Sequence, residues 1–198
     1  MTLAQLNSRP RDEFVRIVGP VFEHSPWIAE RAWAQRPFSS AASLKFALAE
    51  AVRASSREAQ LGLIRAHPEL AGKAKVALTV ESSSEQQRAG LAQCSPEEFD
   101  ALQRLNANYN AKFGWPFILA VRGPRGLGLS RGEIISTFER RLHSHPDVEF
   151  AECLRHIHRI AELRLNDKLG ITPFLGEQVW AWAETLSQHS DAGAAGLT

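Results

Sequence analysis

The chain has 198 residues, of which 44% are hydrophobic and 23% charged, and its formal net charge is +1. This length suits one domain, and the composition allows an ordinary hydrophobic core. The balance of basic and acidic side chains argues against a nucleic-acid-binding protein, which normally carries a basic stripe. No apolar run is long enough to span a bilayer, and residues 1–11 lack the pattern of a signal peptide. The two cysteines give neither a disulfide framework nor a metal-type spacing, so we expect a reduced, cytoplasmic protein.

Helix-start signals recur along the chain. Ser25 and Thr172 each precede a proline, a residue favoured at the first helical position. Serine–glutamate pairs at the spacing of a capping box predict three more helix starts, at Ser55 with Glu58, Ser95 with Glu98, and Ser130 with Glu133.

Two of the predicted helices are long. One follows Ser95 and stops at Gly114, and the other runs from about residue 148 to 169 and stops at Gly170. Residues 117–121 form the only extended apolar segment, which is too isolated to build a sheet. The sequence therefore predicts an all-α fold, a single-domain bundle of about eight helices over residues 1–187 with one short extended segment near 117–121. Residues 188–198 are rich in alanine and glycine and are expected to form a flexible tail.

His67 is the first candidate for chemistry. Pro68 disfavours helical geometry at the residue before it, so His67 should lie where a helix ends. The unpaired carbonyls of a helix end can hold one ring nitrogen and leave the other available for proton transfer. On local sequence alone, a histidine that merely interacts with the helix end is the more common case.

Two further segments could bind a small polar molecule. Residues 82–91 carry serines followed by Glu85 and Gln86, a pattern typical of a helix start, and a helix N-terminus also attracts anionic groups. Residues 106–123 combine a helix end at Gly114 with the extended segment, whose backbone groups need partners that a sheet does not supply. The alternatives are an ordinary capped helix and a buried connector that bonds to neighbouring helices.

Five motifs considered together resemble a known family. They are Phe22-Glu23-His24-Ser25-Pro26-Trp27, Ala66-His67-Pro68-Glu69-Leu70, residues 82–91 with Glu85-Gln86, Phe113-Gly114-Trp115-Pro116-Phe117, and Ile160-Ala161-Glu162-Leu163-Arg164-Leu165. In order and spacing they are similar to the 2-oxo-4-hydroxy-4-carboxy-5-ureidoimidazoline (OHCU) decarboxylases. The resemblance covers about residues 14–169, nearly the whole chain.

This resemblance implies an all-helical homodimer that converts OHCU to (S)-allantoin, the last step of urate oxidation, without a metal or an organic cofactor. It places the essential histidine at His67 and the late arginine at Arg164, although Arg159 lies on the same helix. The chain ends without a peroxisomal signal, which favours a bacterial-type cytoplasmic enzyme. The substrate-binding residues that it implies are Pro68, Ser82, Ser83, Ser84, Glu85, Gln86, Phe117, Ile118, Leu119, Ala120 and Val121.

The chemistry of the implied reaction suits these residue types. The unsaturated ring of the substrate can accept the electron pair left by carbon dioxide, so no cofactor is required as an electron sink. We expect His67 to act as general acid/base, and Glu85 to orient His67 or accept a substrate N–H. Arg164 would stabilise charge on the carboxylate or on the developing enolate, and the backbone of 117–121 would fix the ring orientation.

Three other readings remain as alternatives. A metal-dependent hydrolase could use His143 with His145 or His156 with His158, but the second pair lies two apart on a helix and cannot share a face. Residues 123–128 resemble a phosphate loop without its Gly-Lys-Ser/Thr ending. A catalytically inactive helical interaction module of the same pathway could present the five tryptophans, Trp27, Trp33, Trp115, Trp180 and Trp182.

Overall fold

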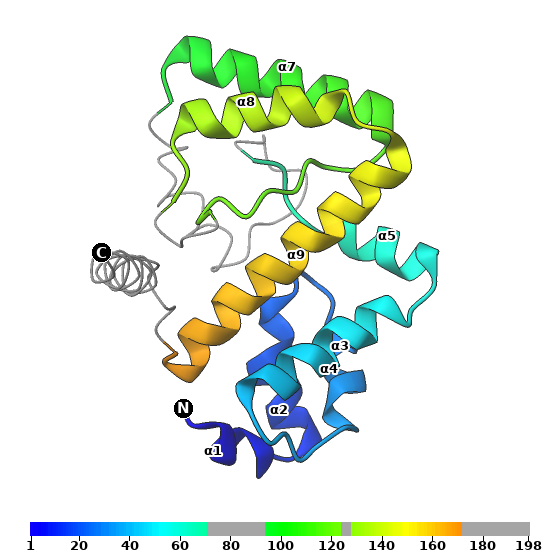
Figure 1. Ribbon diagram of the computed structural model, residues 1–198, viewed down its shortest axis with the longest axis vertical. Coiled ribbons are helices and arrows are strands. Elements are labelled where there is room, and N and C mark those ends of the chain that lie inside the picture. Colours follow the sequence, from blue (N-terminus) through cyan, green and yellow to red (C-terminus); the bar gives the residue numbers. More distant parts are fainter. Residues whose placement is uncertain (71–93, 124–127, 172–198) are drawn as a thin grey trace, which may run out of the picture.

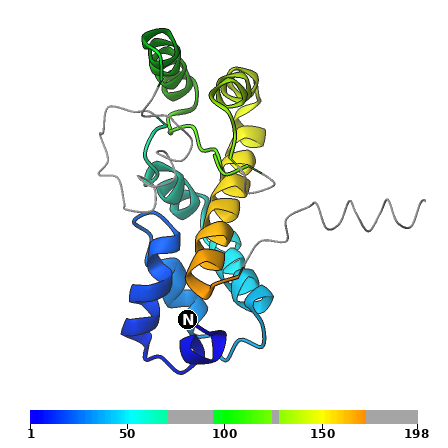
Figure 2. The same ribbon diagram turned by 90° about the vertical axis from the view of Figure 1, so that its left-hand side faces the viewer.

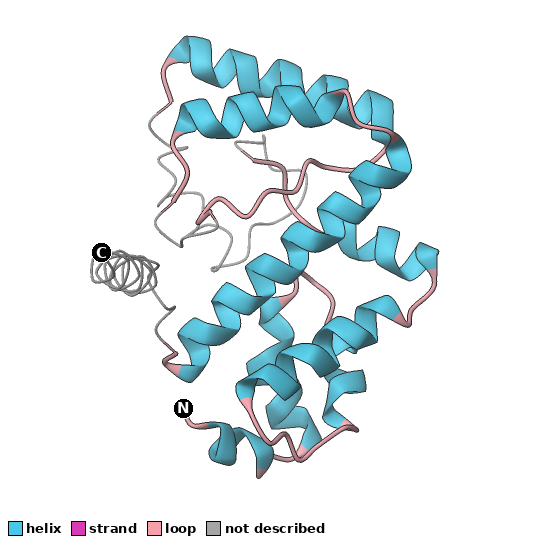
Figure 3. Cartoon of the chain, in the orientation of Figure 1, coloured by secondary structure: helices cyan, strands magenta, loops and turns pink. Residues whose placement is uncertain are grey.

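The computed structural model describes residues 1–70, 94–123 and 128–171. Within these ranges the chain forms eight α-helices and one 3-10 turn and contains no strand, which confirms the predicted all-α class (Figure 3). The elements are α1 (Leu3–Asn7), α2 (Arg11–Val18), η1 (Gly19–Val21), α3 (Trp27–Trp33), α4 (Ala41–Arg53), α5 (Arg57–Arg65), α7 (Pro96–Phe113), α8 (Arg131–Leu142) and α9 (Pro146–Leu169).

Helix α9 connects the two ends of the molecule. At one end, α7 and α8 lie side by side as a layer, and at the other end α1 to α4 form a cluster (Figure 1). Helix α9 starts beside the α7–α8 layer, crosses the molecule diagonally and packs against α5 and η1 on its way to the N-terminal cluster. A residue on α9 can therefore contact either the segment beneath the α7–α8 layer or the turn around η1.

Several helix boundaries follow the predicted signals. The Ser95–Glu98 and Ser130–Glu133 capping boxes start α7 and α8, with both reciprocal hydrogen bonds present. Gly114 and Gly170 end α7 and α9 in the left-handed conformation, with φ of 78° and 66°, which glycine adopts without steric strain.

Two predicted helix starts were wrong by one residue. Helix α5 is capped by Ser56, whose hydroxyl accepts the N–H of Ala59, while the Ser55 hydroxyl donates to the carbonyl of Val52 in the previous helix. Helix α3 begins after Pro26 without a side-chain cap, so Ser25 is not the cap. The predicted start at Thr172 and the predicted tail lie outside the described residues. None of the described helices has the length and apolar character needed to cross a membrane.

Candidate functional site

His67 lies just beyond the end of α5, as the His-Pro pair predicts. Its side chain is buried, at 5% relative exposure, and its Nδ1 lies 2.9 Å from the carbonyl oxygen of Leu63. Because a carbonyl oxygen only accepts, Nδ1 must carry the proton, and in the neutral ring Nε2 then holds a lone pair. Nε2 is buried and has no hydrogen-bond partner in the described part of the chain. The fold therefore presents an oriented proton acceptor at this position.

The surroundings of His67 keep its ring neutral. Burial lowers the pKa of His67 from its ordinary 6.5 to about 4. The carbonyl of Leu63 and the Glu23 carboxylate act in the opposite direction, and the charges of Arg164 and His24 lower the pKa further. Because the folded protein binds a proton at His67 less tightly than free histidine does, the ring is unprotonated at neutral pH. Its Nε2 lone pair is therefore available to accept a proton.

Those electrostatic neighbours include a buried ion pair between distant parts of the chain. Arg164 on α9 places Nη2 3.0 Å from Oε1 of Glu23, and the two side chains are 3% and 0% exposed. A second guanidinium nitrogen, Nη1, lies 3.5 Å from the carbonyl oxygen of Val21. These contacts bring the predicted Arg164 into the electrostatic environment of the predicted His67. Arg159, the alternative, instead pairs with Glu162 on its own helix at 2.8 Å, where both side chains are partly exposed.

The backbone at Glu23 turns sharply. His24 has φ of 44°, a left-handed conformation that is uncommon for a non-glycine residue and often marks a functional position. The sequence alone assigns no role to the motif around Phe22. Its function in the structure is to bring a carboxylate under α9.

The segment after His67 is held against α7. The side-chain amide of Asn106 donates to the carbonyl of Leu70 at 2.9 Å, and that of Asn110 donates to the Glu69 carboxylate at 2.6 Å. Pro68, which precedes both Glu69 and Leu70, is half-buried. In both views this segment runs beside the extended stretch that follows α7 (Figures 1 and 2).

That extended stretch is buried, and its members Phe117, Ile118, Leu119, Ala120 and Val121 are all at most 6% exposed. Its backbone is partly bonded to neighbouring elements, as a buried connector would be. Arg141 on α8 donates to the carbonyl of Ile118 at 2.6 Å, and the N–H of Ala120 donates to Nδ1 of His156 on α9 at 3.3 Å. The backbone of Leu119 makes no hydrogen bond within the described residues.

A buried polar network supports this stretch, and the sequence analysis did not identify it. Arg141 and Glu149 are fully buried and form an ion pair of 2.5 Å, and the Tyr109 hydroxyl donates to the same carboxylate oxygen. Cys153 lies 3.4 Å from that hydroxyl, and burial raises the pKa of its thiol. One signal was available in the sequence, because Ile134, Phe138 and Arg141 share a helical face, which places an arginine on the buried side of α8.

The other predicted residues divide into two groups. Ser82, Ser83, Ser84, Glu85 and Gln86 lie outside the described residues. The proposed metal-binding histidines do not converge, because His156 binds the backbone of Ala120 whereas His158 packs edge-on against Phe22. The described tryptophans do not form one exposed surface, since Trp115 is buried and Trp27 and Trp33 pack against the core.

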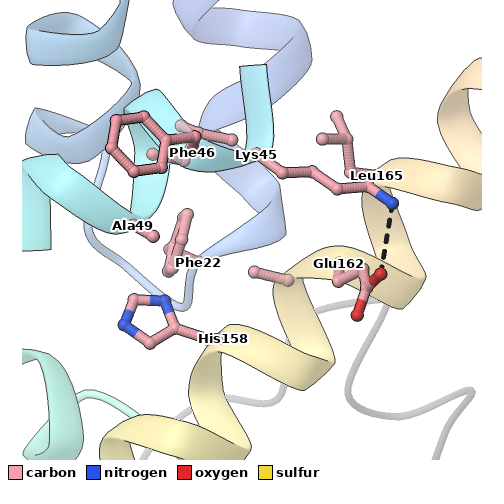
Figure 4. A pocket seen from close by; sticks show the side chains of 9 residues that line it. Phe22, Lys45, Phe46, Ala49, His158, Glu162 and Leu165 are labelled. Atoms are coloured by element: carbon pink, nitrogen blue, oxygen red, sulfur yellow. Dashed lines mark hydrogen bonds and ion pairs between the residues drawn. The ribbon is translucent and has the colours of Figure 1, made fainter. Parts of the chain in front are cut away.

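A cavity of about 290 Å³ lies on another side of α9, between α4 and α9 (Figure 4). Its polar groups are Lys45, which pairs with Glu162 at 3.2 Å, and the ring of His158. His67 is not among the residues that line it. The cavity is therefore separate from the histidine site, although Phe22 and Leu165 are chain neighbours of Glu23 and Arg164.

The sequence matches one known protein family and several of its members. A family model described as OHCU decarboxylase matches residues 7–166. The 2-oxo-4-hydroxy-4-carboxy-5-ureidoimidazoline decarboxylase of Haloferax volcanii is 41% identical over 168 residues, which cover 85% of this chain and 96% of that protein. The "Uric acid degradation bifunctional protein" of a Bacillus species is also 41% identical, over 84% of this chain but 32% of that longer protein.

A solved structure agrees with the sequence matches. The crystal structure of (S)-allantoin synthase superposes with a TM-score of 0.68 at 26% identity, covering 85% of this chain and 54% of that one. The family model spans most of the chain, and the Haloferax protein matches over nearly its full length. The chain therefore belongs to the OHCU decarboxylase family.

Proposed function

We propose that this protein decarboxylates OHCU to (S)-allantoin in urate degradation, with His67 as the group that transfers a proton. The names of its relatives support the substrate, the product and the pathway. The observation that carries the role of His67 is its fixed geometry: a buried neutral ring whose Nδ1 is held by Leu63 and whose Nε2 has no partner among the described residues.

In the proposed reaction, the bond between the carboxyl carbon and the hydroxyl-bearing ring carbon breaks and carbon dioxide leaves. The electron pair forms a double bond between the two ring carbons, the pair of the adjacent C=N bond moves onto the ring nitrogen, and that nitrogen takes one proton from solvent. The hydroxyl gives its proton to Nε2 of His67 and becomes a carbonyl. His67 then returns that proton to the ring carbon that bears the ureido group. One proton is taken up overall, which balances the charge of the lost carboxylate.

Arg164 would stabilise the anionic substrate and the negative charge that develops on the ring. Its guanidinium is positioned for this role by Glu23, which binds Nη2 at 3.0 Å and so restricts the rotation of a long side chain. Glu85 and the serines before it are proposed to complete the binding site from a segment outside the described residues. None of these steps requires a metal or an organic cofactor, since the ring itself accepts the electron pair.

The extended segment is proposed to bind the substrate ring through its backbone N–H and carbonyl groups. Leu119 has an N–H and a carbonyl that make no hydrogen bond within the described residues, although the residue is 6% exposed. Buried backbone groups are nearly always paired, so a planar ring with adjacent donors and acceptors is a suitable partner. Fixing the ring plane decides which face receives the proton and thus the handedness of the product.

We also propose that the protein is a cytoplasmic homodimer, as the resemblance to the family implies. Sedimentation equilibrium tests the assembly, because one chain has a mass of 21.9 kDa and a dimer sediments with twice that mass. A single species at the mass of one chain over a wide concentration range would contradict the dimer.

The reaction is tested by generating OHCU in situ from urate with the two preceding enzymes and following (S)-allantoin by circular dichroism. His67→Asn is the informative variant, because the asparagine amide can still donate to Leu63 but has no equivalent of Nε2. Loss of general acid–base catalysis should lower kcat by about 10²- to 10⁴-fold. His143→Asn makes the same substitution at an exposed position and serves as the control. A wild-type rate no faster than the uncatalysed reaction would refute the decarboxylase and favour an inactive interaction module.

A further inference from the structure

Two helices hold the middle of the extended stretch through its backbone, and the carbonyls of Ala120 and Val121 accept the N–H groups of Gly123 and Leu129 in the turn that follows. In an extended chain, the N–H and carbonyl of one residue point to the same side, and those of the next residue point to the opposite side. The carbonyl of Ile118 is bound by Arg141 on α8, and the N–H of Ala120 is bound by His156 on α9. The carbonyl of Ile118 and the N–H of Ala120 therefore point toward α8 and α9. The alternation directs the backbone groups of Leu119 away from these helices.

Arg141 is itself held rigidly. Its Nε and Nη2 lie 3.0 and 2.5 Å from Oε1 of Glu149, and its guanidinium carbon lies 4.4 Å from the centre of the Phe117 ring. The remaining nitrogen, Nη1, donates to the carbonyl of Ile118 at 2.6 Å. Only an arginine offers donors in this fixed fork, so the carbonyl is held in a defined direction and not merely near a charge.

His156 acts as an acceptor because of its tautomer. Its Nδ1 receives the N–H of Ala120, and its Nε2 lies 3.3 Å from a carboxylate oxygen of Glu152. A carboxylate accepts, so the proton of the neutral ring belongs on Nε2 and the lone pair on Nδ1. The side chain is 19% exposed, and its burial together with the neighbouring positive charge of Arg141 lowers the pKa of His156, which favours the neutral form.

We propose that Arg141 and His156 are positioning residues for the decarboxylation. Together they bind the backbone at two points that flank Leu119, so that its N–H and carbonyl face the substrate ring at a fixed angle. This inference rests on the proposed function of the chain and assigns roles to two residues outside the five recognised motifs. Neither side chain contacts the substrate; both act through the backbone that they hold.

The test compares two substitutions at one residue with a control on the same helix. His156→Leu keeps most of the volume but has no acceptor, whereas His156→Asn places its amide oxygen close to the position of Nδ1. His158→Leu is the matched control, because His158 is also a partly buried histidine of α9 but makes no hydrogen bond within the described residues. Each variant is assayed for kcat/KM, for the optical purity of the allantoin formed and for its unfolding temperature.

We expect His156→Leu to lower kcat/KM by about 10- to 100-fold and to yield partly racemic allantoin, because a small displacement of a positioning group is enough to reduce the rate this much. His156→Asn should recover most of the rate and the optical purity. The His158→Leu control should retain both, with an unfolding temperature similar to that of His156→Leu. A merely structural role for His156 would change the unfolding temperature without affecting optical purity.

Amide hydrogen exchange measures the positioning step independently of activity. The N–H of Ala120 should exchange faster in His156→Leu than in the wild type and return toward the wild-type rate in His156→Asn. If His156→Leu unfolds, Arg141→Lys replaces it as the test, because lysine keeps the buried charge but cannot bind Glu149 and Ile118 together. An active wild type whose variants retain full rate and optical purity would overturn this inference alone. A wild type that does not convert OHCU would refute the proposed function instead.

Discussion

Acidification should destabilise this protein through His67 at pH values where most carboxylates are still charged. In the unfolded chain His67 has an ordinary pKa near 6.5, whereas burial lowers the pKa to about 4 in the folded protein. Between these two values the unfolded chain binds a proton that the folded chain does not. The free energy of unfolding is therefore unaffected above pH 6.5, decreases as the pH falls from 6.5, and has lost the full contribution below pH 4.

The magnitude follows from that interval. One pH unit corresponds to about 1.4 kcal/mol for each proton that only the unfolded chain binds. From 6.5 down to about 4, the loss attributable to His67 is about 3 kcal/mol. A domain of this size typically has about 5 to 15 kcal/mol of stability in total, so this loss is large enough to measure.

The assay is urea unfolding, followed by tryptophan fluorescence, at several pH values from about 7.5 to about 4.5. The asparagine in His67→Asn cannot titrate but keeps a donor for Leu63. The slope of its free energy of unfolding against pH should therefore be smaller than that of the wild type by the contribution of one proton. The comparison uses the slopes, since the substitution can change the absolute stability. His156 remains in both proteins and contributes equally to both slopes. Equal slopes for the wild type and His67→Asn would refute the reasoning that His67 is held neutral by the fold.

Three further outcomes are expected. The kcat/KM of the wild type should be nearly independent of pH from neutral down to about pH 5, because His67 stays unprotonated over that range, and should fall as the pH approaches 4. A pH profile of kcat/KM with its midpoint near 6.5 would contradict this. Arg164→Lys should lower kcat/KM by about 10-fold or more, because lysine cannot bind Glu23 and Val21 together. Arg159→Lys should change kcat/KM by no more than about twofold, because its partner Glu162 lies near the surface. Equal effects of the two substitutions would remove the distinction between the two arginines. A thiol reagent should modify Cys153 only on unfolding, since this buried thiol has a raised pKa, and mass spectrometry of the labelled native protein checks this.

Local sequence patterns predicted several helix ends correctly. Serine–glutamate pairs predicted the starts of α7 and α8, and terminal glycines predicted the ends of α7 and α9, because both signals act on backbone groups within one turn. At Ser55 and Ser56 the same rule gave the wrong residue, since two adjacent serines each fit a helix start. The choice between them depends on the path of the preceding helix, to which the Ser55 hydroxyl donates.

The candidate site was only partly predictable for the opposite reason. The position of His67 follows from Pro68, its immediate neighbour in the sequence. The ion pair between Glu23 and Arg164 joins residues 141 positions apart, and no local pattern indicates that they meet. Arg141 and Glu149 were overlooked because charged side chains on helices usually face solvent, and a buried pair is recognised only when both partners are known to lie on apolar faces.

His67 and His156 show why the histidine content alone does not identify the catalytic residue. In both, burial lowers the pKa to about 4, so both rings are neutral at physiological pH. They differ in the nitrogen that keeps its lone pair. At His156 this nitrogen already accepts the N–H of Ala120, so a substrate proton would have to displace a backbone hydrogen bond. At His67 the bonded nitrogen is the donor, and the lone pair on Nε2 has no partner among the described residues. The tautomer imposed by the backbone, rather than the pKa, therefore separates the proposed proton-transfer residue from the proposed positioning residue.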